Sequence, residues 1–451
     1  MNKISKLDEF IKNPQKALFT LSLPMMAGMS VQAIYMLIDT AFIGHWVGGS
    51  ALAGLGIVFP PMFIIMGITF GLGSGATTVI AQSIGEKNKQ KADNSAEHII
   101  VLGLLLSLFF VLIGIFFGDY IIKSQTEDYN ALSNASDYFY TMLYGTPFMI
   151  LSIFFRSILS GEGDNMMPMK VLGFGTLVNL LLDPLFIYYF AIKGAAIATV
   201  ISQATVFLIF IYLMIIKDRN YISLDLNNFK YNSKIFSNIL KIGIPASLSM
   251  LIMSLGLFFY NMILNQTEYS SNAIAAYSTC HRIEHLFFIP IISLATSMVT
   301  LIGMFYGARK INLITDLIYF SIKVSVIISL IYSLFFLTCS EFILGLFTND
   351  KEIIAIGVGY FKIFAFAIPF ISIAMNCSRA MQGLGKAYPM FIITCLRVII
   401  ISCFLSYYFI IILEKPIYYA WYSVLISCIT SSIISFLWLI KIKGKLTSYK
   451  L

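Results

Sequence analysis

The sequence predicts an all-α integral membrane protein in which twelve transmembrane helices form two parallel-repeat six-helix bundles. Three observations predict this fold class: an apolar composition, a series of long hydrophobic stretches, and a repeat that relates the two halves of the chain. Of the 451 residues, 59% are hydrophobic and only 12% are charged. A water-soluble core cannot hide that much apolar surface, so we expect the chain to lie in a membrane.

Each predicted span is long enough to cross the hydrocarbon core as a helix that satisfies its own backbone hydrogen bonds. The first half contains six such stretches, at 17–43, 51–84, 95–118, 133–158, 167–190 and 195–216. The second half contains six more, at 237–264, 272–306, 314–338, 354–381, 388–412 and 417–440. An even number of spans in each half leaves both halves in the same orientation, so the repeat is expected to be parallel.

The two halves are related by an offset of 222 residues. Small and turn-forming residues recur at that offset, Ala51 as Ala273, Thr78 as Thr300, Pro147 as Pro369 and Gly161 as Gly383. The repeat predicts an amino-terminal lobe (1–216), a polar cytoplasmic connector (217–234) and a carboxy-terminal lobe (235–451). Paired lobes of this kind are common in secondary transporters, where access alternates between the two sides of the membrane.

Lysine and arginine are distributed unevenly between the loops on the two sides of the membrane. They crowd the two termini and the connector, whereas the opposite loops contain only Lys123, Lys193, Lys351 and Lys415. Because positively charged loops stay on the inner side, we expect a multi-pass protein of the plasma membrane with both termini in the cytoplasm. The net charge of +8 follows from this bias, and no nucleic-acid partner is expected.

Two aspartates are the only charged residues within long apolar stretches of the first lobe. Asp39 is alone between Lys16 and Glu86, and Asp183 is alone between Lys170 and Lys193. An aspartate at the centre of a membrane helix costs about 2.5–3.5 kcal/mol on insertion scales, so such residues usually face a bundle interior or an aqueous cavity. At the repeat positions the second lobe has Asn261 and Leu405. The acids therefore indicate that the first lobe does the ion chemistry.

Asn179 precedes Asp183 by one helical turn, so the amide and the carboxylate project from the same helix face. Together they are suited to hold a proton or a cation. A carboxyl group withdrawn from water can gain a proton on one side of the membrane and release it on the other, and a cluster of oxygen ligands also suits Na⁺. The sequence leaves H⁺ and Na⁺ open as the coupling ion, and no other cofactor is expected.

Pro24 lies inside the first span and removes a backbone donor there, so we expect the helix to bend or break near it and to act as a hinge.

In the eighth span, His281, Glu284 and His285 match the H-x-x-E-H pattern of inverted zincin proteases. No later histidine can supply a third imidazole, so we prefer Arg282 and Glu284 as a compensating polar pair. A proton-responsive role for the two histidines stays open.

Three short motifs resemble the multidrug and toxic compound extrusion (MATE) family, specifically its DinF-like branch. They are the run from Gln32 through Tyr35 and Asp39 to Gly44, the run Asn179-x-x-x-Asp183-Pro184, and the run Gly194-Ala-Ala-x-Ala-Thr199. The resemblance covers essentially the whole chain, including the duplicated lobes. It implies a V-shaped pair of six-helix bundles that exports lipophilic, often cationic compounds in exchange for H⁺ or Na⁺.

The resemblance also implies roles for particular residues. Position by position, it implies an ion-coupling network of Asp39, Asn179, Asp183 and Thr199 and cavity residues at Gln32 and Tyr35. We expect further substrate contacts from Met36, Gln203, Arg282 and Glu284. The acidic pair that other MATE branches have in the carboxy-terminal lobe is not evident, so coupling is expected through the amino-terminal lobe only.

The sequence thus predicts a monomeric secondary active multidrug exporter, an antiporter rather than an enzyme, whose partners are small organic molecules and membrane lipid. A flippase for a lipid-linked precursor is the main alternative, although few basic residues fall mid-span to bind a pyrophosphate. An intramembrane zinc protease is the second alternative. No Walker A sequence is present, so ATP hydrolysis within this chain is not expected. The physiological substrate and the stoichiometry stay open.

Overall fold

The computed structural model describes residues 5–47, 49–125, 128–217 and 220–448, and it leaves out some side chains within the first two long helices and at the end of the last helix. Every regular element in the described residues is helical. Eleven of these helices are long and apolar enough to cross a membrane. The all-α membrane fold is therefore confirmed, with a count that differs from the predicted twelve because one long element contains two of the predicted spans.

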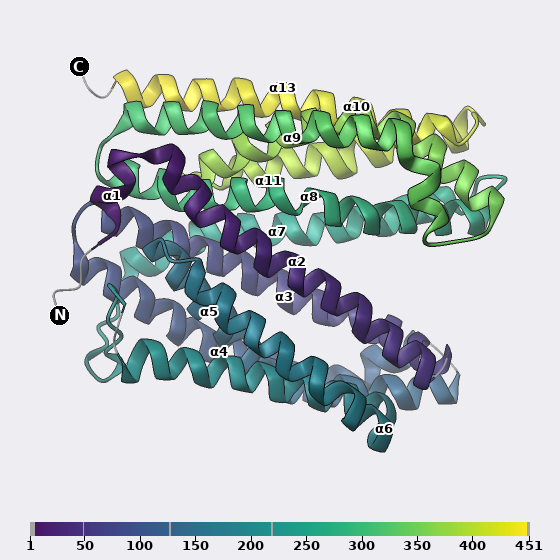
Figure 1. Cartoon of the computed structure of the whole chain (residues 1–451), viewed down its shortest axis with the longest axis horizontal. Helices are drawn as coiled ribbons and strands as arrows, with labels where there is room; N and C mark the ends of the chain where they lie inside the picture. Colours follow the sequence, from purple (N-terminus) through teal and green to yellow (C-terminus); the bar gives the residue numbers. More distant parts are fainter. Residues whose placement is uncertain (1–4, 48, 126–127, 218–219, 449–451) are drawn as a thin grey trace. The chain divides into compact units, whose positions relative to one another are not determined.

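The helices of the amino-terminal half pack around α5. In chain order they are α1 (Leu7–Lys12), α2 (Pro14–Trp46), α3 (Gly49–Gly85), α4 (Lys89–Lys123), α5 (Tyr129–Glu162) and α6 (Met166–Ile211), which continues as the π-helix η1 (Tyr212–Ile216). Figure 1 shows these elements in purple to teal, and α3, α4 and α6 all contact α5. The apolar side chains between these helices exclude water from the centre of this unit.

The long element α6 is a helical hairpin that contains the predicted spans 167–190 and 195–216. Its helical geometry is interrupted at Ala191, where φ is 51° and ψ is −135°. Beyond this point the second leg packs back on the first, and the Ser202 hydroxyl donates a hydrogen bond of 2.7 Å to the Gly175 carbonyl oxygen. The two predicted spans are therefore the two legs of the hairpin, and the predicted break between them falls at this tight turn.

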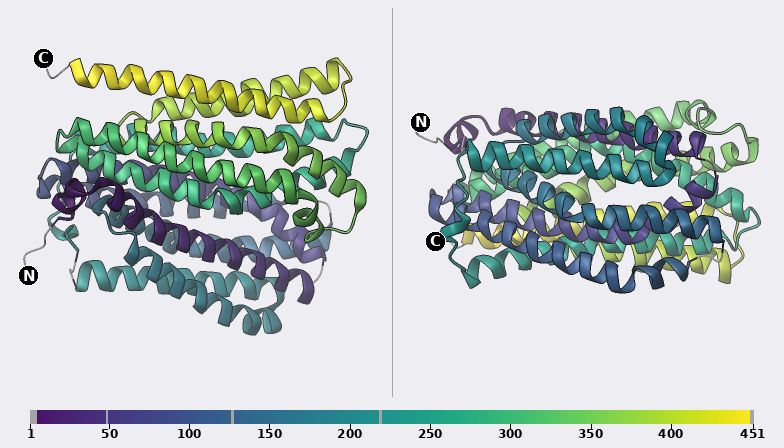
Figure 2. Two further views of the ribbon diagram at one scale, coloured as in Figure 1. Left: turned by 45° about the horizontal axis from the view of Figure 1, so that its top comes forward. Right: turned by 90° about the horizontal axis from the view of Figure 1, so that it is seen from below.

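The helices of the carboxy-terminal half pack around α10. They are α7 (Ser233–Leu264), α8 (Ser270–Gly307), α9 (Ile311–Gly345), α10 (Lys351–Gly383), α11 (Tyr388–Cys395), η3 (Leu396–Cys403), α12 (Phe404–Tyr407), η4 (Tyr408–Ile412) and α13 (Tyr418–Ser448). The elements from α11 to η4 form one span of alternating α- and π-helix. Helices α8, α9 and α13 contact α10 and run lengthwise beside it (Figure 2).

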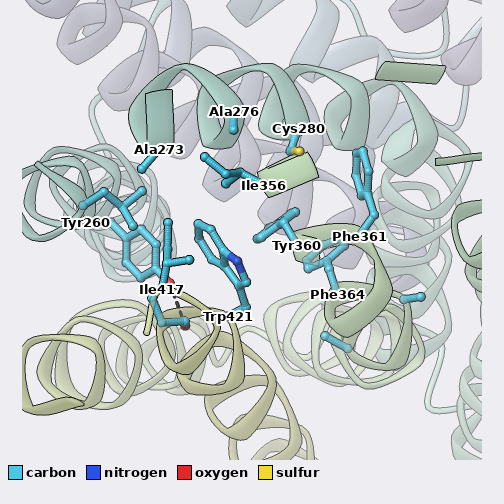
Figure 3. Close-up of a cluster of buried hydrophobic side chains, with 14 of the residues drawn as sticks. Tyr260, Ala273, Ala276, Cys280, Ile356, Tyr360, Phe361, Phe364, Ile417 and Trp421 are labelled. Carbon is cyan, nitrogen blue, oxygen red and sulfur yellow. Dashed lines mark hydrogen bonds between the residues drawn. The ribbon is translucent and has the colours of Figure 1, made fainter. Parts of the chain in front are cut away.

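An aromatic core fills the interior of this second half (Figure 3). Trp421 is 1% exposed, and its ring centroid lies 4.9 Å from that of Tyr360. The Tyr260 hydroxyl donates a hydrogen bond of 2.7 Å to the Ala420 carbonyl oxygen. Burial of such large rings stabilises the packing of α7, α8, α10 and α13 against one another.

The chain falls into two compact units whose limits differ from the predicted lobe limits. One unit is Leu23–Gly243 together with the segment that ends at Asp8, and the other is Glu9–Ser22 together with Ile244–Leu451. Helix α2 therefore changes unit between Ser22 and Leu23, next to Pro24. The helix is uninterrupted on both sides of Pro24, so it does not break there, and the alternative of a bend stays a prediction. The predicted lobe limits remain a prediction.

Acidic side chains and a histidine hold the described part of the connector against the first unit. Their acceptor atoms bind successive backbone N–H groups: Tyr221 to Glu162 Oε1 (2.7 Å), Ser223 to Asp93 Oδ1 (3.0 Å), Asp225 to Glu97 Oε1 (3.2 Å) and Asn232 to His98 Nε2 (2.9 Å). Residues 218 and 219 lie outside the described residues. From residue 220 onward, these hydrogen bonds hold the connector against the first unit.

A substitution at Gly194 tests the geometry of the α6 hairpin. A Cβ atom at this position would lie 1.9 Å from the carbonyl oxygen of Phe186 on the other leg, whereas a Cβ at Gly173 of the same element would meet nothing within 4 Å. Since backbone must move to accept the added atom, we expect Gly194→Ala to lower stability by about 1–3 kcal/mol. Thermal melting of the purified protein in detergent measures this effect. Gly173→Ala is the matched control, and equal melting temperatures for the two variants would contradict the hairpin geometry.

Candidate ion site and adjoining pocket

The two isolated aspartates of the first unit meet inside one cluster of polar side chains. Asp183 on the first leg of α6 is fully buried, and Asn179 one turn earlier donates a hydrogen bond of 2.7 Å from Nδ2 to Asp183 Oδ1. The spacing of four residues predicts this contact, since such residues lie on the same helix face. The amide leaves the second carboxylate oxygen, Oδ2, for partners from other helices.

Helix α2 supplies those partners. The Tyr35 hydroxyl donates a hydrogen bond of 3.4 Å to Asp183 Oδ2, and the carboxyl groups of Asp39 and Asp183 lie within hydrogen-bonding range of each other. The Asp39 Oδ1 atom is buried without a hydrogen-bond partner among the described residues. Two carboxyl groups this close are stable together when they share a proton or a cation. The arrangement is therefore chemically suited to bind one small positive ion.

Thr199 and Tyr138 complete the cluster. The Thr199 hydroxyl, on the second leg of α6, lies within hydrogen-bonding range of that of Tyr35 and donates a hydrogen bond of 3.0 Å to the Ala195 carbonyl oxygen. Tyr138 of α5 lies within electrostatic range of both aspartates. Sequence reasoning missed Tyr138, because one tyrosine among 25 has no distinguishing local pattern.

A pocket adjoins this cluster along the same two helices. It is a small, open pocket with a cavity volume of about 20 Å³, and its lining residues are Pro24, Met25, Gly28, Met29 and Gln32 of α2, Arg156 of α5, Asn165, and Pro168, Met169 and Leu172 of α6. A Cβ atom on Gly28 would lie 3.6 Å from the Met169 side chain, so the two helices are close there. Gln32 precedes Tyr35 by three residues and faces the pocket. The pocket and the ion cluster thus occupy successive turns of α2 and α6.

The remaining predicted substrate contacts in the first unit lie elsewhere or are not described. The Met36 side chain lies outside the described residues. Gln203, on the second leg of α6, has a buried amide oxygen without a hydrogen-bond partner among the described residues, and it does not line the pocket. Their substrate contacts remain predictions.

In the second unit, the predicted pairing of Arg282 with Glu284 is wrong. Arg282 is exposed, Glu284 is only 6% exposed, and the ion-pair partner of Glu284 is His281, with 3.6 Å between His281 Nδ1 and Glu284 Oε2. Residues two apart on a helix do not face each other, whereas residues three apart do. In the described part of the chain, no three His, Cys, Asp or Glu side chains form a group that could hold a metal ion.

Comparison with known proteins places the chain among membrane exporters. The MatE family profile matches residues 24–185 and 245–408. The chain is 26% identical over 372 residues to a probable multidrug resistance protein, YoeA, of Bacillus subtilis, with 80% of each chain covered. It is 28% identical over 388 residues to the multidrug export protein MepA of Staphylococcus aureus, with 85% of each covered.

A solved structure has the same fold. It is a MOP superfamily transporter from Pyrococcus furiosus, for which a reverse polarity of the binding pocket suggested a different function. The TM-score is 0.94 and the sequence identity is 28%, with 99% of this chain and 100% of that chain covered.

The contact between Asn179 and Asp183 can be measured by a double-mutant cycle. Because each single change to leucine leaves one buried polar partner unmatched, Asn179→Leu and Asp183→Leu should not act additively on stability, with a coupling of about 1 kcal/mol or more. The melting temperatures of the wild type, both single variants and the double variant give the cycle. Additive shifts would show that the amide does not support the carboxylate.

Proposed function

The chain belongs to the MatE family of multidrug efflux transporters, and on this premise we propose that it exports lipophilic or cationic organic compounds in antiport with H⁺ or Na⁺ by alternating access. One observation carries the proposal: Asp39 and Asp183 lie together in a buried cluster that continues into a pocket along the same helices. Helices α2 and α6 therefore contribute both to the proposed site for a small positive ion and to the proposed site for an organic molecule.

Coupling follows from what the ion changes in the cluster. When a proton or Na⁺ binds between the aspartates, the carboxylate that accepts the Tyr35 hydrogen bond loses part of its negative charge. The link between α2 and α6 then weakens at Tyr35, one turn from Gln32 in the pocket. An ion that favours one arrangement of α2 disfavours a substrate that requires the other, which is the condition for exchange.

Pro24 is the proposed hinge for this movement. It lines the pocket and lies two residues beyond the point where α2 passes from one compact unit to the other. Its missing N–H leaves one carbonyl of the preceding turn without its usual helical partner, so bending there disrupts fewer hydrogen bonds than elsewhere in α2. A bend at this point alters the pocket directly.

The proposal also covers the branch of the family, the oligomeric state and the orientation in the membrane. We place the chain in the DinF-like branch on the motifs that contain Asp39, Asn179 and Thr199, and we expect a monomer in the plasma membrane with cytoplasmic termini. Export is favoured over a lipid-precursor flippase because the described lining of the pocket contains a single cation, Arg156. A flippase for a pyrophosphate-linked lipid needs a more basic cavity.

The aspartates are tested by amide substitution. Asp39→Asn and Asp183→Asn each remove the charge that holds the coupling ion, so we expect at least a tenfold loss of gradient-driven efflux of a lipophilic cation, about 1.4 kcal/mol of coupling. The assay uses proteoliposomes with separately imposed proton and sodium gradients, which also identifies the ion. Asp137→Asn, an exposed aspartate of α5, is the control. Near-normal efflux by both variants would remove the acids from the mechanism.

The hinge is tested by Pro24→Ala. Alanine restores the backbone donor and stiffens α2, so efflux should fall several-fold while the melting temperature stays the same or rises. Pro147→Ala in α5 is the comparison, since that proline lies outside the pocket lining. If Pro24→Ala exports at the wild-type rate, the hinge is elsewhere.

A further inference from the structure

Arg156 is a cation of the first unit that the proposed ion mechanism does not use. It lies on α5, six residues before the helix ends at Glu162, which is about 9 Å along the helix axis. It lines the pocket together with Gln32 and Asn165. An arginine at this depth in a membrane protein is costly and is normally matched by an opposite charge or by hydrogen bonds.

No such match exists for the guanidinium group among the described residues. Its one recorded interaction is with the face of the Phe70 ring, whose centroid lies 5.9 Å from Arg156 Cζ. The nearby acids are engaged elsewhere: Glu162 accepts the backbone N–H groups of Tyr221 and Ile222, and Asp164 pairs with Lys6 at 3.8 Å. The pocket therefore contains a positive charge without a counter-charge.

Arg379 of the second unit stands one residue beyond the repeat position of Arg156, which is Ser378, and differs from Arg156 in its hydrogen bonding. Arg379 lies on α10, the repeat counterpart of α5, and its Nη1 donates a hydrogen bond of 2.9 Å to Gln382 Oε1 on the same helix. Residue 159, three positions after Arg156, is a leucine and offers no such acceptor. The donors of Arg156 are thus left for a molecule in the pocket.

We propose that this pocket binds the oxyanion group of an amphiphilic substrate, a carboxylate or a phosphate, at Arg156. The inference rests on the proposed export function and adds that its lipophilic substrates include amphiphiles with an oxyanion group, such as zwitterions. A guanidinium group donates two parallel hydrogen bonds to such an oxyanion. The thioethers of Met25, Met29 and Met169 adapt to apolar bodies of different shapes, and the Gln32 amide adds a polar contact.

The test compares two dyes that differ only in the proposed group: a rhodamine with a free carboxylate and its methyl ester. Fluorescence polarisation measures the binding of each to the purified full-length protein. We expect the wild type to bind the carboxylate more tightly, and Arg156→Gln to weaken that binding by at least about tenfold while the ester changes by less than about twofold. Arg156→Lys, which retains the charge without the planar fork, should be intermediate. Lys170→Gln controls for surface charge, since Lys170 is exposed and outside the pocket lining.

Short-chain phosphatidylglycerol distinguishes the two sources of an oxyanion. If it displaces the carboxylate dye from the wild type, a lipid phosphate occupies the site, and if it does not, the site takes soluble carboxylates. Equal weakening of both dyes by Arg156→Gln, or weakening of neither, in a variant that melts at the wild-type temperature would overturn the proposal. Binding needs no ion gradient, so this result stands apart from the efflux of the Asp39 and Asp183 variants.

Discussion

Two carboxyl groups in an apolar bundle must share a positive charge, and the first unit is organised around that constraint. Asp183 is fully buried, Asp39 lies within hydrogen-bonding range of it, and the only direct donors to Asp183 are the Asn179 amide and the Tyr35 hydroxyl among the described residues. Neither donor carries a charge. Two carboxyl groups so placed are stabilised when a proton or a cation lies between them, and this is the basis of the coupling that we propose.

The same two helices carry this cluster and the pocket, so the two sites are mechanically linked. Met169 and Leu172 of α6 line the pocket, and Asn179 and Asp183 follow on later turns of the same leg. On α2, Gln32 faces the pocket and Tyr35 reaches the carboxylate. In the proposed mechanism, a displacement at one site reaches the other along these helices, because a helix is stiff over so short a distance.

The two halves of the chain use the same architecture for different interiors. The first unit has a hydrogen-bonded cluster around its acids, whereas the second has a core of packed aromatic rings around Trp421 and Tyr360, whose rings meet edge to face. Asn261 stands at the repeat position of Asp39, and its amide oxygen is likewise buried without a hydrogen-bond partner among the described residues. The repeat thus has a buried polar atom at this place in both halves, and the carboxyl group is present there in the first half.

The sequence by itself determined the membrane class, the positions of nearly all spans, and the contacts between residues on one helix face. Hydropathy and helical periodicity are local properties, so the contact between Asn179 and Asp183 could be predicted from their spacing. The contact between His281 and Glu284 could also have been predicted, because the two residues are three apart on one helix, but we paired Glu284 with Arg282 instead. The two legs of the α6 hairpin were likewise predicted as the spans 167–190 and 195–216, whereas the geometry of the turn at Ala191 was not.

Only the tertiary structure decided which helix faces meet. The approach of Asp39 to Asp183, the position of Tyr138 beside both, and the placement of Arg156 in a pocket with Pro24 all join residues far apart in the chain. Each depends on the rotation and depth of one helix against another. Side-chain packing along the whole interface sets those quantities, and no local pattern encodes them.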